Sequence, residues 1–238
     1  MPTITYSIHP AIFAQFPAFQ RGIVLAWNLT NGPSSEALLA LLRKEEEALR
    51  GRLPAAEANE HPRIKAWREA FRSVGIKPAD FRPSIDAMAR RVLRGEALPS
   101  INTLVDIGNL ISLRHLVPTG SHAIDHLTKD ISLRPASGSE NFIPFGSETL
   151  EHPEPDEWIF VEDQTVLTRR WAWRQSNHTL TLPETTAVEF NIDALPVIPD
   201  DEVQLICSEV AGLVQRFCGG ETRVDLISAA HPQITFDV

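Results

Sequence analysis

The residues best suited to chemistry lie in one apolar stretch, residues 101–127, which reads INTLVDIGNLISLRHLVPTGSHAIDHL. Its dense groups of apolar residues are interrupted by polar side chains, among them Asp106, Asn109, His122 and Asp125. A buried polar group without a hydrogen-bond partner is costly, so each of them needs a partner in the fold. Asparagine and histidine can also orient a water molecule or stabilise an oxyanion. The residues themselves leave two interpretations open: a buried element with satisfied polar groups, or the lining of a hydrolytic pocket.

Familiar catalytic and cofactor signatures are absent from the sequence. It has no Gly-x-Ser-x-Gly elbow, no phosphate-binding loop, no Gly-x-Gly-x-x-Gly and no Cys-x-x-Cys. His122 and His126 are four residues apart, but the glutamate of the zinc-binding helix motif is missing. Nothing around Cys207 or Cys218 indicates an activated thiol. We therefore expect neither a metal nor another cofactor.

The elements around this stretch predict a mixed α/β (α+β) protein. Alternation over Thr3–Ile8 and the continuous apolar run 22–29 are typical of strands. Further strands are predicted at 130–135, 187–192 and 223–228, with 231–238 either strand or tail, and a hairpin is predicted from 157–161 and 165–173. A turn at 31–34 is predicted to lead into a helix, with Pro33 near its first turn, that runs to about Arg50. Another helix is predicted over 201–217, where apolar residues recur with a 3.6-residue period.

Two short predicted helices between residues 61 and 95 carry an unusual positive charge. This window holds nine basic and three acidic residues, a net charge of +6, which leaves −15 on the rest of a chain whose total is −9. Ser84 is expected to cap the second helix. A basic region on an acidic body can attract a polyanion to one face, although solvated arginines on ordinary amphipathic helices fit equally well. The candidate phosphate contacts, here called the basic strip, are Arg63, Lys65, Arg68, Arg72, Arg90, Arg91 and Arg94.

Length and composition limit the domain organisation and the cellular location that we expect. A chain of 238 residues can bury a sizeable core, and we expect one domain over residues 1–238. Its expected parts are N-terminal strands and a helix (1–60), a core (61–200), and a C-terminal helix and strand (201–238). No apolar run is long enough to span a membrane, and residues 1–10 lack the pattern of a secretory signal. Two cysteines are too few for a disulfide framework, so a reduced, cytoplasmic protein is expected.

Two motifs in the central stretch resemble a known family. VDIGN (105–109) and SHAID (121–125) are similar to the "VDITN…LHAFD" signature of the tRNA-editing module, the paired B-three/B-four domain, in the β subunit of bacterial phenylalanyl-tRNA synthetase. The resemblance covers residues 76–196, about half of the chain. It implies a layered sheet–sheet–helix sandwich. It also implies that Asn109, His122 and Glu189 are catalytic and converge on one pocket, which would hold an amino acid and the ribose of adenosine. The substrate-pocket residues that it implies are Gly108, Gly120, Ser121, Trp171, Trp173 and Arg174.

The chain departs from that family at the implied pocket. The synthetase has a glycine-rich "AGVMGG" segment where this chain has RWAWRQ (170–175), and a threonine where this chain has Gly108. The large side chains of RWAWRQ would reshape a pocket. The synthetase's own substrate, tyrosine mischarged on phenylalanine tRNA, is therefore not carried over to this chain. Nothing resembles the ATP-binding subunit, so aminoacylation is not expected.

The resemblance implies a trans-acting aminoacyl-tRNA deacylase whose partner is the aminoacylated 3′ end of a tRNA. Water suffices as the nucleophile for this activated ester, while Glu189 holds the α-ammonium group or a polar side chain of the amino acid. Two other functions stay open: a tRNA-binding module that has lost its pocket chemistry, and a binder of amino-acid-like small molecules. No membrane partner is expected, and the oligomeric state is left open, with a monomer among the options.

Overall fold

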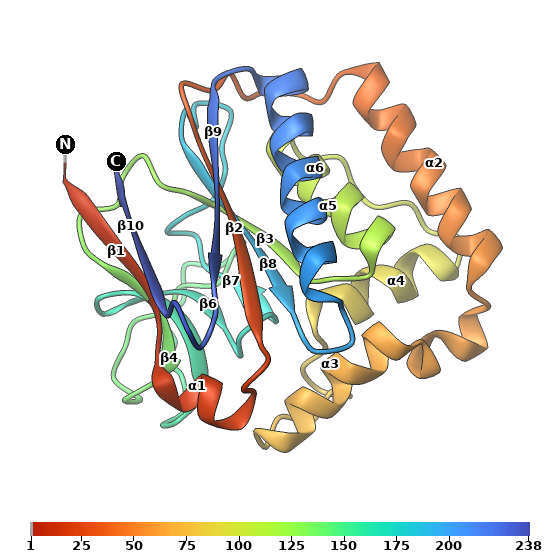
Figure 1. Cartoon of the computed structure of the whole chain (residues 1–238). Coiled ribbons are helices and arrows are strands. Elements are labelled where there is room, and N and C mark those ends of the chain that lie inside the picture. Colours follow the sequence, from red (N-terminus) through yellow and green to blue (C-terminus); the bar gives the residue numbers. More distant parts are fainter. Residues whose placement is uncertain (1) are drawn as a thin grey trace.

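The computed structural model describes residues 2–238 and arranges them in three layers. Two β-sheets pack face to face, and a layer of helices covers the outer face of the second sheet (Figure 1). This is the sheet–sheet–helix sandwich that the resemblance implies, so the predicted mixed fold is confirmed.

The first sheet has six strands in the order β10-β1-β4-β5-β6-β7. Their bounds are β10 Gln233–Asp237, β1 Thr3–Ile8, β4 Ile131–Pro135, β5 Trp158–Glu162, β6 Thr165–Arg169 and β7 Arg174–Gln175. β1 and β4 are parallel, and the other neighbours are antiparallel. Because β1 pairs with β10, the two ends of the described chain lie side by side, with Thr3 opposite Asp237 (Figure 1).

The second sheet has four antiparallel strands in the order β3-β8-β2-β9. Their bounds are β3 Thr119–Ala123, β8 Val188–Ala194, β2 Gln20–Trp27 and β9 Glu221–Ile227. Successive side chains of a strand project to opposite faces of the sheet, so residues two apart share a face. Glu189, Asn191 and Asp193 therefore share one face of β8, and Val188, Phe190 and Ile192 share the other. Glu189 contacts Tyr6 of β1, so the first set faces the six-stranded sheet. Phe190 lies beside Gly108 of α5, so the second set faces the helices.

Helices α5 and α6 cover the four-stranded sheet, and α2 packs against α5 on the side away from the sheet (Figure 1). The bounds of the helices are α1 Pro10–Gln15, α2 Glu36–Arg52, α3 Pro62–Ser73, α4 Ser84–Leu93, α5 Thr103–His115 and α6 Asp200–Cys218, with a 3-10 helix, η1, at Ala55–Glu60. The layer packs closely on β2 because Gly22 lacks a side chain. A Cβ at Gly22 would lie 2.3 Å from Sγ of Cys207 in α6. The predicted core position of Cys207 is confirmed.

The central stretch 101–127 forms a helix followed by a strand. Asn102 caps α5 by accepting a hydrogen bond from the backbone N–H of Val105, as expected of an asparagine before a helix. Leu116 ends the helix in a left-handed conformation, and the chain enters β3 three residues later. This sharp change of direction sets Asn109 on the helix beside the edge strand that carries His122.

Three predictions about local structure are wrong. Residues 170–173 do not extend the hairpin strand, because Arg170 and Trp171 have positive φ angles of 47° and 64°. Such angles are costly for residues other than glycine. They are held here because the Trp171 ring packs at 4.8–5.4 Å from the rings of Trp67, Phe19, Trp158 and Phe16.

The other two wrong predictions concern helix starts. Ser84 is the first residue of α4 and does not cap it, since Pro83 holds the cap position without a side-chain hydrogen bond. Likewise α2 begins at Glu36, where Ser35 caps it, and Pro33 lies outside the helix. The segment Pro10–Gln15 is a helix that the sequence analysis did not predict.

Candidate functional site

A polar cavity of about 190 Å³ opens where the edge strand β3 meets α4, α5 and the loop before β7. It reaches inward between the two sheets. Its lining includes Arg21, Ser84, Met88, Asn109, Pro118, Thr119, Gly120, His122, Phe160, Thr168, Trp171, Ala172, Trp173, Arg174, Gln175, Asn191 and Asp193. These residues come from widely separated parts of the sequence, so only the folded chain forms this site.

His122 and Asn109 both line this cavity, but they differ in exposure and in hydrogen bonding. The His122 side chain is 4% exposed, and its Nδ1 lies 2.7 Å from the Thr179 hydroxyl. The second ring nitrogen, Nε2, lies 3.4 Å from the Thr168 hydroxyl. Asn109 is partly exposed and makes no side-chain hydrogen bond within residues 2–238, so its amide is open to the cavity. The pair offers one fixed imidazole and one amide that can bind a ligand.

Burial and a nearby cation keep the His122 imidazole neutral. Desolvation, together with the charge of Arg21, lowers the pKa of His122 from 6.5 to about 3. A group with such a low pKa is a weak base, so it accepts or donates a hydrogen bond without carrying charge at neutral pH.

A buried ion pair forms the inner wall of the cavity. The Arg21 guanidinium donates two hydrogen bonds to the Asp193 carboxylate, at 2.5 and 2.8 Å, and a third to the Tyr6 hydroxyl at 2.8 Å. Both charged side chains are fully buried. The guanidinium also lies 5.2 Å from the centre of the Phe160 ring. Such a pair fixes the geometry of the wall, because each charge is stable only beside the other.

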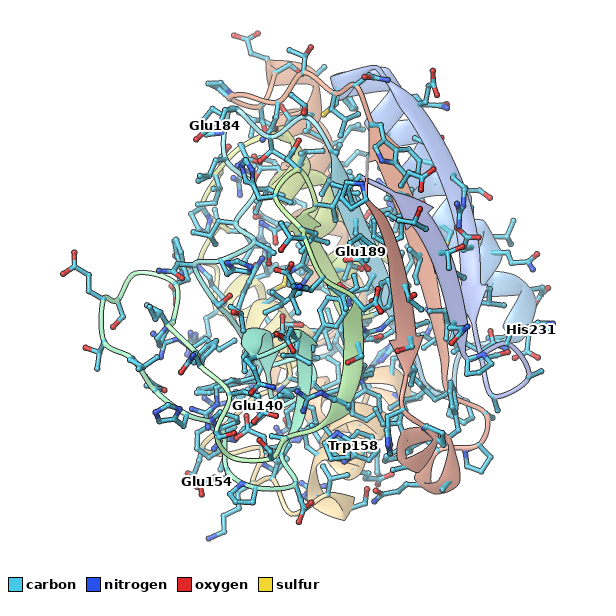
Figure 2. The ribbon with its side chains drawn as sticks, turned by 90° about the vertical axis from the view of Figure 1, so that its left-hand side faces the viewer. Glu140, Glu154, Trp158, Glu184, Glu189 and His231 are labelled. Carbon is cyan, nitrogen blue, oxygen red and sulfur yellow. The ribbon has the colours of Figure 1, made fainter. Side chains whose placement is uncertain are left out.

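Glu189 lies behind this wall. It pairs with His122 across β8 and β3, and both side chains project toward the six-stranded sheet. Its Oε1 accepts a hydrogen bond from the Tyr6 hydroxyl at 3.2 Å, while Oε2 has no partner within residues 2–238. Figure 2 shows Glu189 in the interior of the molecule. Burial raises the pKa of Glu189 from 4.5 to about 8, so it is a neutral acid at pH 7.

Glu189 should give the protein a specific pH dependence of stability. Between pH 4.5 and about 8 the folded state retains a proton on Glu189 that the unfolded state has lost. The free energy of unfolding therefore falls as pH rises through this window, by about 1.4 kcal/mol per pH unit from this group. Glu189→Gln removes the titration, so wild type should lose stability relative to this variant between these limits. Urea unfolding at pH 4.5, 6, 7 and 8 measures the difference.

Comparing wild type with Glu189→Gln separates the effect of Glu189 on stability from that of His122. The lowered pKa of His122 has the opposite effect, raising stability as pH rises from about 3 to 6.5, but it acts equally in both proteins. Parallel stability curves for wild type and variant would contradict the assignment of a raised pKa to Glu189.

The structure brings most of the expected pocket residues together. Asn109 and His122 line the cavity, as do Gly120, Trp171, Trp173 and Arg174. Glu189, Gly108 and Ser121 are not among its lining residues. Gly108 lies on the other side of the sheet, where a Cβ would be 3.6 Å from the Phe190 ring. Asp106 accepts hydrogen bonds from the hydroxyls of Ser34 and Ser100. Oδ1 of Asp125 accepts from the backbone N–H and the hydroxyl of Thr186, while its buried Oδ2 has no partner within residues 2–238.

The charged inner wall was not predicted from the sequence. Arg21 is the one charged residue in strand β2, whose other residues are mostly apolar and buried, and this was a usable signal. A charge in a buried strand requires a buried partner. The polar residues that alternate along β8, Glu189, Asn191 and Asp193, were the second signal.

The basic strip is largely paired with acidic residues. Arg68 and Arg90 both contact the buried Asp86, and Arg63 contacts Glu202 at 2.6 Å. The exposed members have exposed partners: Lys65 pairs with Glu60, while Arg91 and Arg94 pair with Glu96. Arg72 has no ion-pair partner within residues 2–238. Exposed pairs are weak, so Lys65, Arg72, Arg91 and Arg94 are the members that a polyanion can reach.

An open apolar groove of about 310 Å³ lies beside the cavity. Its lining comprises Ile101, Val105, Phe145, Trp173, Arg174, Gln175, Leu180, Thr181 and Leu182. Trp173, Arg174 and Gln175 line both the groove and the cavity. The polar cavity and the apolar groove are thus two neighbouring parts of one surface region.

Two classes of feature are missing from residues 2–238. No cluster of three or more histidine, cysteine or acidic side chains has the arrangement needed to hold a metal ion. No helix within these residues combines the length and the apolar character needed to cross a membrane.

Comparisons with known proteins identify a family and a protein of similar fold. The family model described as the B3/4 domain matches residues 66–219. The chain is also similar in structure to an N-terminal fragment of the phenylalanyl-tRNA synthetase β-subunit from Pyrococcus horikoshii, with a TM-score of 0.50 and 11% identity. The match covers 92% of this chain and 50% of that chain, so this chain spans about half the length of the fragment. A search of curated protein sequences finds no match.

Proposed function

Because the chain belongs to the B3/4 domain family, we propose that it hydrolyses the ester bond of an aminoacylated tRNA in trans. The observation that carries this proposal is the polar cavity lined by Asn109 and His122, the residues of the two family motifs. The cavity of about 190 Å³ is smaller than the usual pocket for a drug-sized ligand, so it suits a small group such as an aminoacyl moiety. The structural relative is part of a tRNA synthetase subunit, which supports tRNA as the partner.

The proposed reaction uses water as its nucleophile. Water adds to the ester carbonyl, the bond to the ribose oxygen breaks, and the products are a free amino acid and a tRNA with a free hydroxyl. Asn109 and the neutral His122 orient the water and the carbonyl by hydrogen bonds, and a ribose hydroxyl of the terminal adenosine assists proton transfer. Burial raises the pKa of Cys207 to about 12 and that of Cys218 to about 11, so neither supplies a thiolate.

Glu189 has a supporting role in this proposal. Since it is a neutral acid that does not line the cavity, it holds the shape of the site through Tyr6 and does not bind the α-ammonium group by charge. Ser121 likewise acts from outside the cavity, because its carbonyl accepts a hydrogen bond from the side chain of Gln175, which lines it.

A deacylation screen across mischarged tRNAs tests the proposal. Release of the amino acid from at least one of them, faster than spontaneous hydrolysis, is the expected result. Tight tRNA binding without release from any of them would favour a non-catalytic tRNA-binding module. The low exposure of His122, whose ring nitrogens already have hydroxyl neighbours, is the observation that favours this second function. Binding of a free amino acid but not tRNA would indicate a small-molecule binder.

The reachable part of the basic strip should contact tRNA phosphates. Replacing Arg72 and Arg91 by glutamate is expected to weaken binding of all tRNAs alike. It should also reduce the slope of log affinity against log salt by about 0.9 for each duplex phosphate that the protein no longer neutralises. Arg68 and Arg90 are left in place because Asp86 depends on them. Fluorescence anisotropy with labelled tRNA at several salt concentrations measures the effect.

The matched control replaces Lys129 and Arg216 by glutamate, which changes the net charge equally at two other exposed sites. It should alter tRNA affinity much less. Equal weakening by both double variants would mean that only overall charge matters and that the basic strip is an ordinary solvated surface.

A further inference from the structure

The apolar groove holds an unusual concentration of exposed apolar surface. Ile101 is 55% exposed, Phe145 59% and Leu182 44%. These are three of the seven large apolar side chains that are exposed within residues 2–238. They come from separate loops that the fold brings to one place, and gathered exposed apolar residues usually mark a binding surface.

Neighbouring contacts hold the groove in a defined shape. The backbone N–H of Phe145 donates to the carbonyl of Gln175 at 3.0 Å, which fixes the Phe145 loop against β7. The Trp173 ring packs edge-on against Phe81 at 4.8 Å and lies 4.9 Å from the Arg170 guanidinium. Because its walls are already anchored, the groove can accept a flat ring with little ordering of its own.

Arg174 provides a positive charge between the groove and the cavity. Its side chain is partly buried, lines both, and makes no hydrogen bond or ion pair within residues 2–238. Arginine stays charged under all physiological conditions, and its guanidinium matches the geometry of phosphate oxygens. An anion that reaches this point would neutralise it.

The arrangement matches the end of an aminoacylated tRNA. In the terminal nucleotide of such a tRNA, one ribose carries the polar aminoacyl group, the phosphate and the flat base. We propose that the groove binds the terminal base of a tRNA by stacking it against Phe145, and that Arg174 contacts the terminal phosphate. This inference rests on the proposed function, because it assumes that the aminoacyl group enters the cavity. Three exposed side chains are too little surface for a stable contact between two copies of this chain.

Uncharged tRNA that carries 2-aminopurine in place of its terminal adenine tests the base subsite without catalysis. Stacking should quench 2-aminopurine emission when the wild-type protein binds. Phe145→Ala should abolish the quenching and weaken binding by about 5- to 150-fold, the range expected for losing one stacked base. Phe145→Trp should restore both. Leu205→Ala, which removes an apolar side chain that is 66% exposed on α6, is the matched control and should change neither.

A second variant tests the phosphate contact. Arg174→Gln should reduce the salt slope of binding by about 0.7, the value for one single-strand phosphate. Absence of quenching with wild type, or equal quenching with Phe145→Ala, overturns the inference. Loss of a concentration-dependent dimer in Phe145→Ala, without an effect on tRNA, would also overturn it by assigning the groove to a second copy. Quenching without deacylation of any charged tRNA would refute the deacylase function and leave the base subsite standing.

Discussion

Replacing Arg21 by methionine is expected to lower the free energy of unfolding by about 3–5 kcal/mol, the usual effect of removing one partner from a buried ion pair. The substitution keeps most of the volume of the side chain. It leaves the Asp193 carboxylate without its two hydrogen bonds and the Tyr6 hydroxyl without its donor. Desolvation already raises the pKa of Asp193, and the loss of Arg21 should raise it further. Urea unfolding at pH 7 measures the change.

The double variant Arg21→Met/Asp193→Asn separates the charge from the packing. Removing the second charge should recover a large part of the lost stability, because the remaining amide costs less to bury than a carboxylate. If the double variant is less stable than Arg21→Met alone, the loss comes from packing or from hydrogen bonds to Asp193, and the unpaired charge is not its cause.

The His122→Ala variant is expected to slow deacylation by about 100- to 1000-fold, as for the loss of one positioned hydrogen-bond donor. The effect should fall on kcat, since the proposed role of His122 is strongest when charge develops on the ester oxygen. With the pKa of His122 near 3, the rate should show no histidine titration between pH 5 and 8. Steady-state rates with a substrate identified by the screen measure both effects.

The matched control is His126→Ala, four residues away and exposed, which should leave the rate unchanged. Far-UV circular dichroism and an unfolding curve confirm that His122→Ala is folded. If that folded variant retains wild-type activity, His122 takes no part in the reaction. An inflection in the rate near pH 6.5 that disappears in His122→Ala would contradict the neutral imidazole and assign general-base chemistry to His122.

Much of the fold was readable from the sequence because its elements have strong local patterns. The strand Thr3–Ile8 alternates, and helix α6 has a continuous apolar stripe, so both were predicted within a residue of their bounds. The break after Arg169 was not predictable in the same way. TVLTRRWAW looks like a strand throughout, and only the aromatic cluster around Trp171 holds the positive φ angles that end it. Tertiary contacts overrode local preference there.

Only part of the site could be predicted from the sequence, and the reason is physical. Asn109 and His122 lie in recognisable motifs, so their position at the cavity was expected from the resemblance. The Arg21–Asp193 wall joins strands 172 residues apart, and no local spacing predicts that pairing. The positive charge of the basic strip was evident from the sequence. Its pairing with Asp86, Glu96 and Glu202 was not, because that depends on how the helices pack.

The pairing of β1 with β10 has a consequence for how this fold can be combined with others. The backbone N–H of Val238 donates to the carbonyl of Pro2 at 3.2 Å, so the two ends of the described chain lie at almost the same point of the six-stranded sheet. A unit with adjacent ends can be inserted into a surface loop of a host protein without stretching either partner. It can also be circularised by a short linker and reopened elsewhere. A fold closed by paired first and last strands is thus suited to insertion into longer chains.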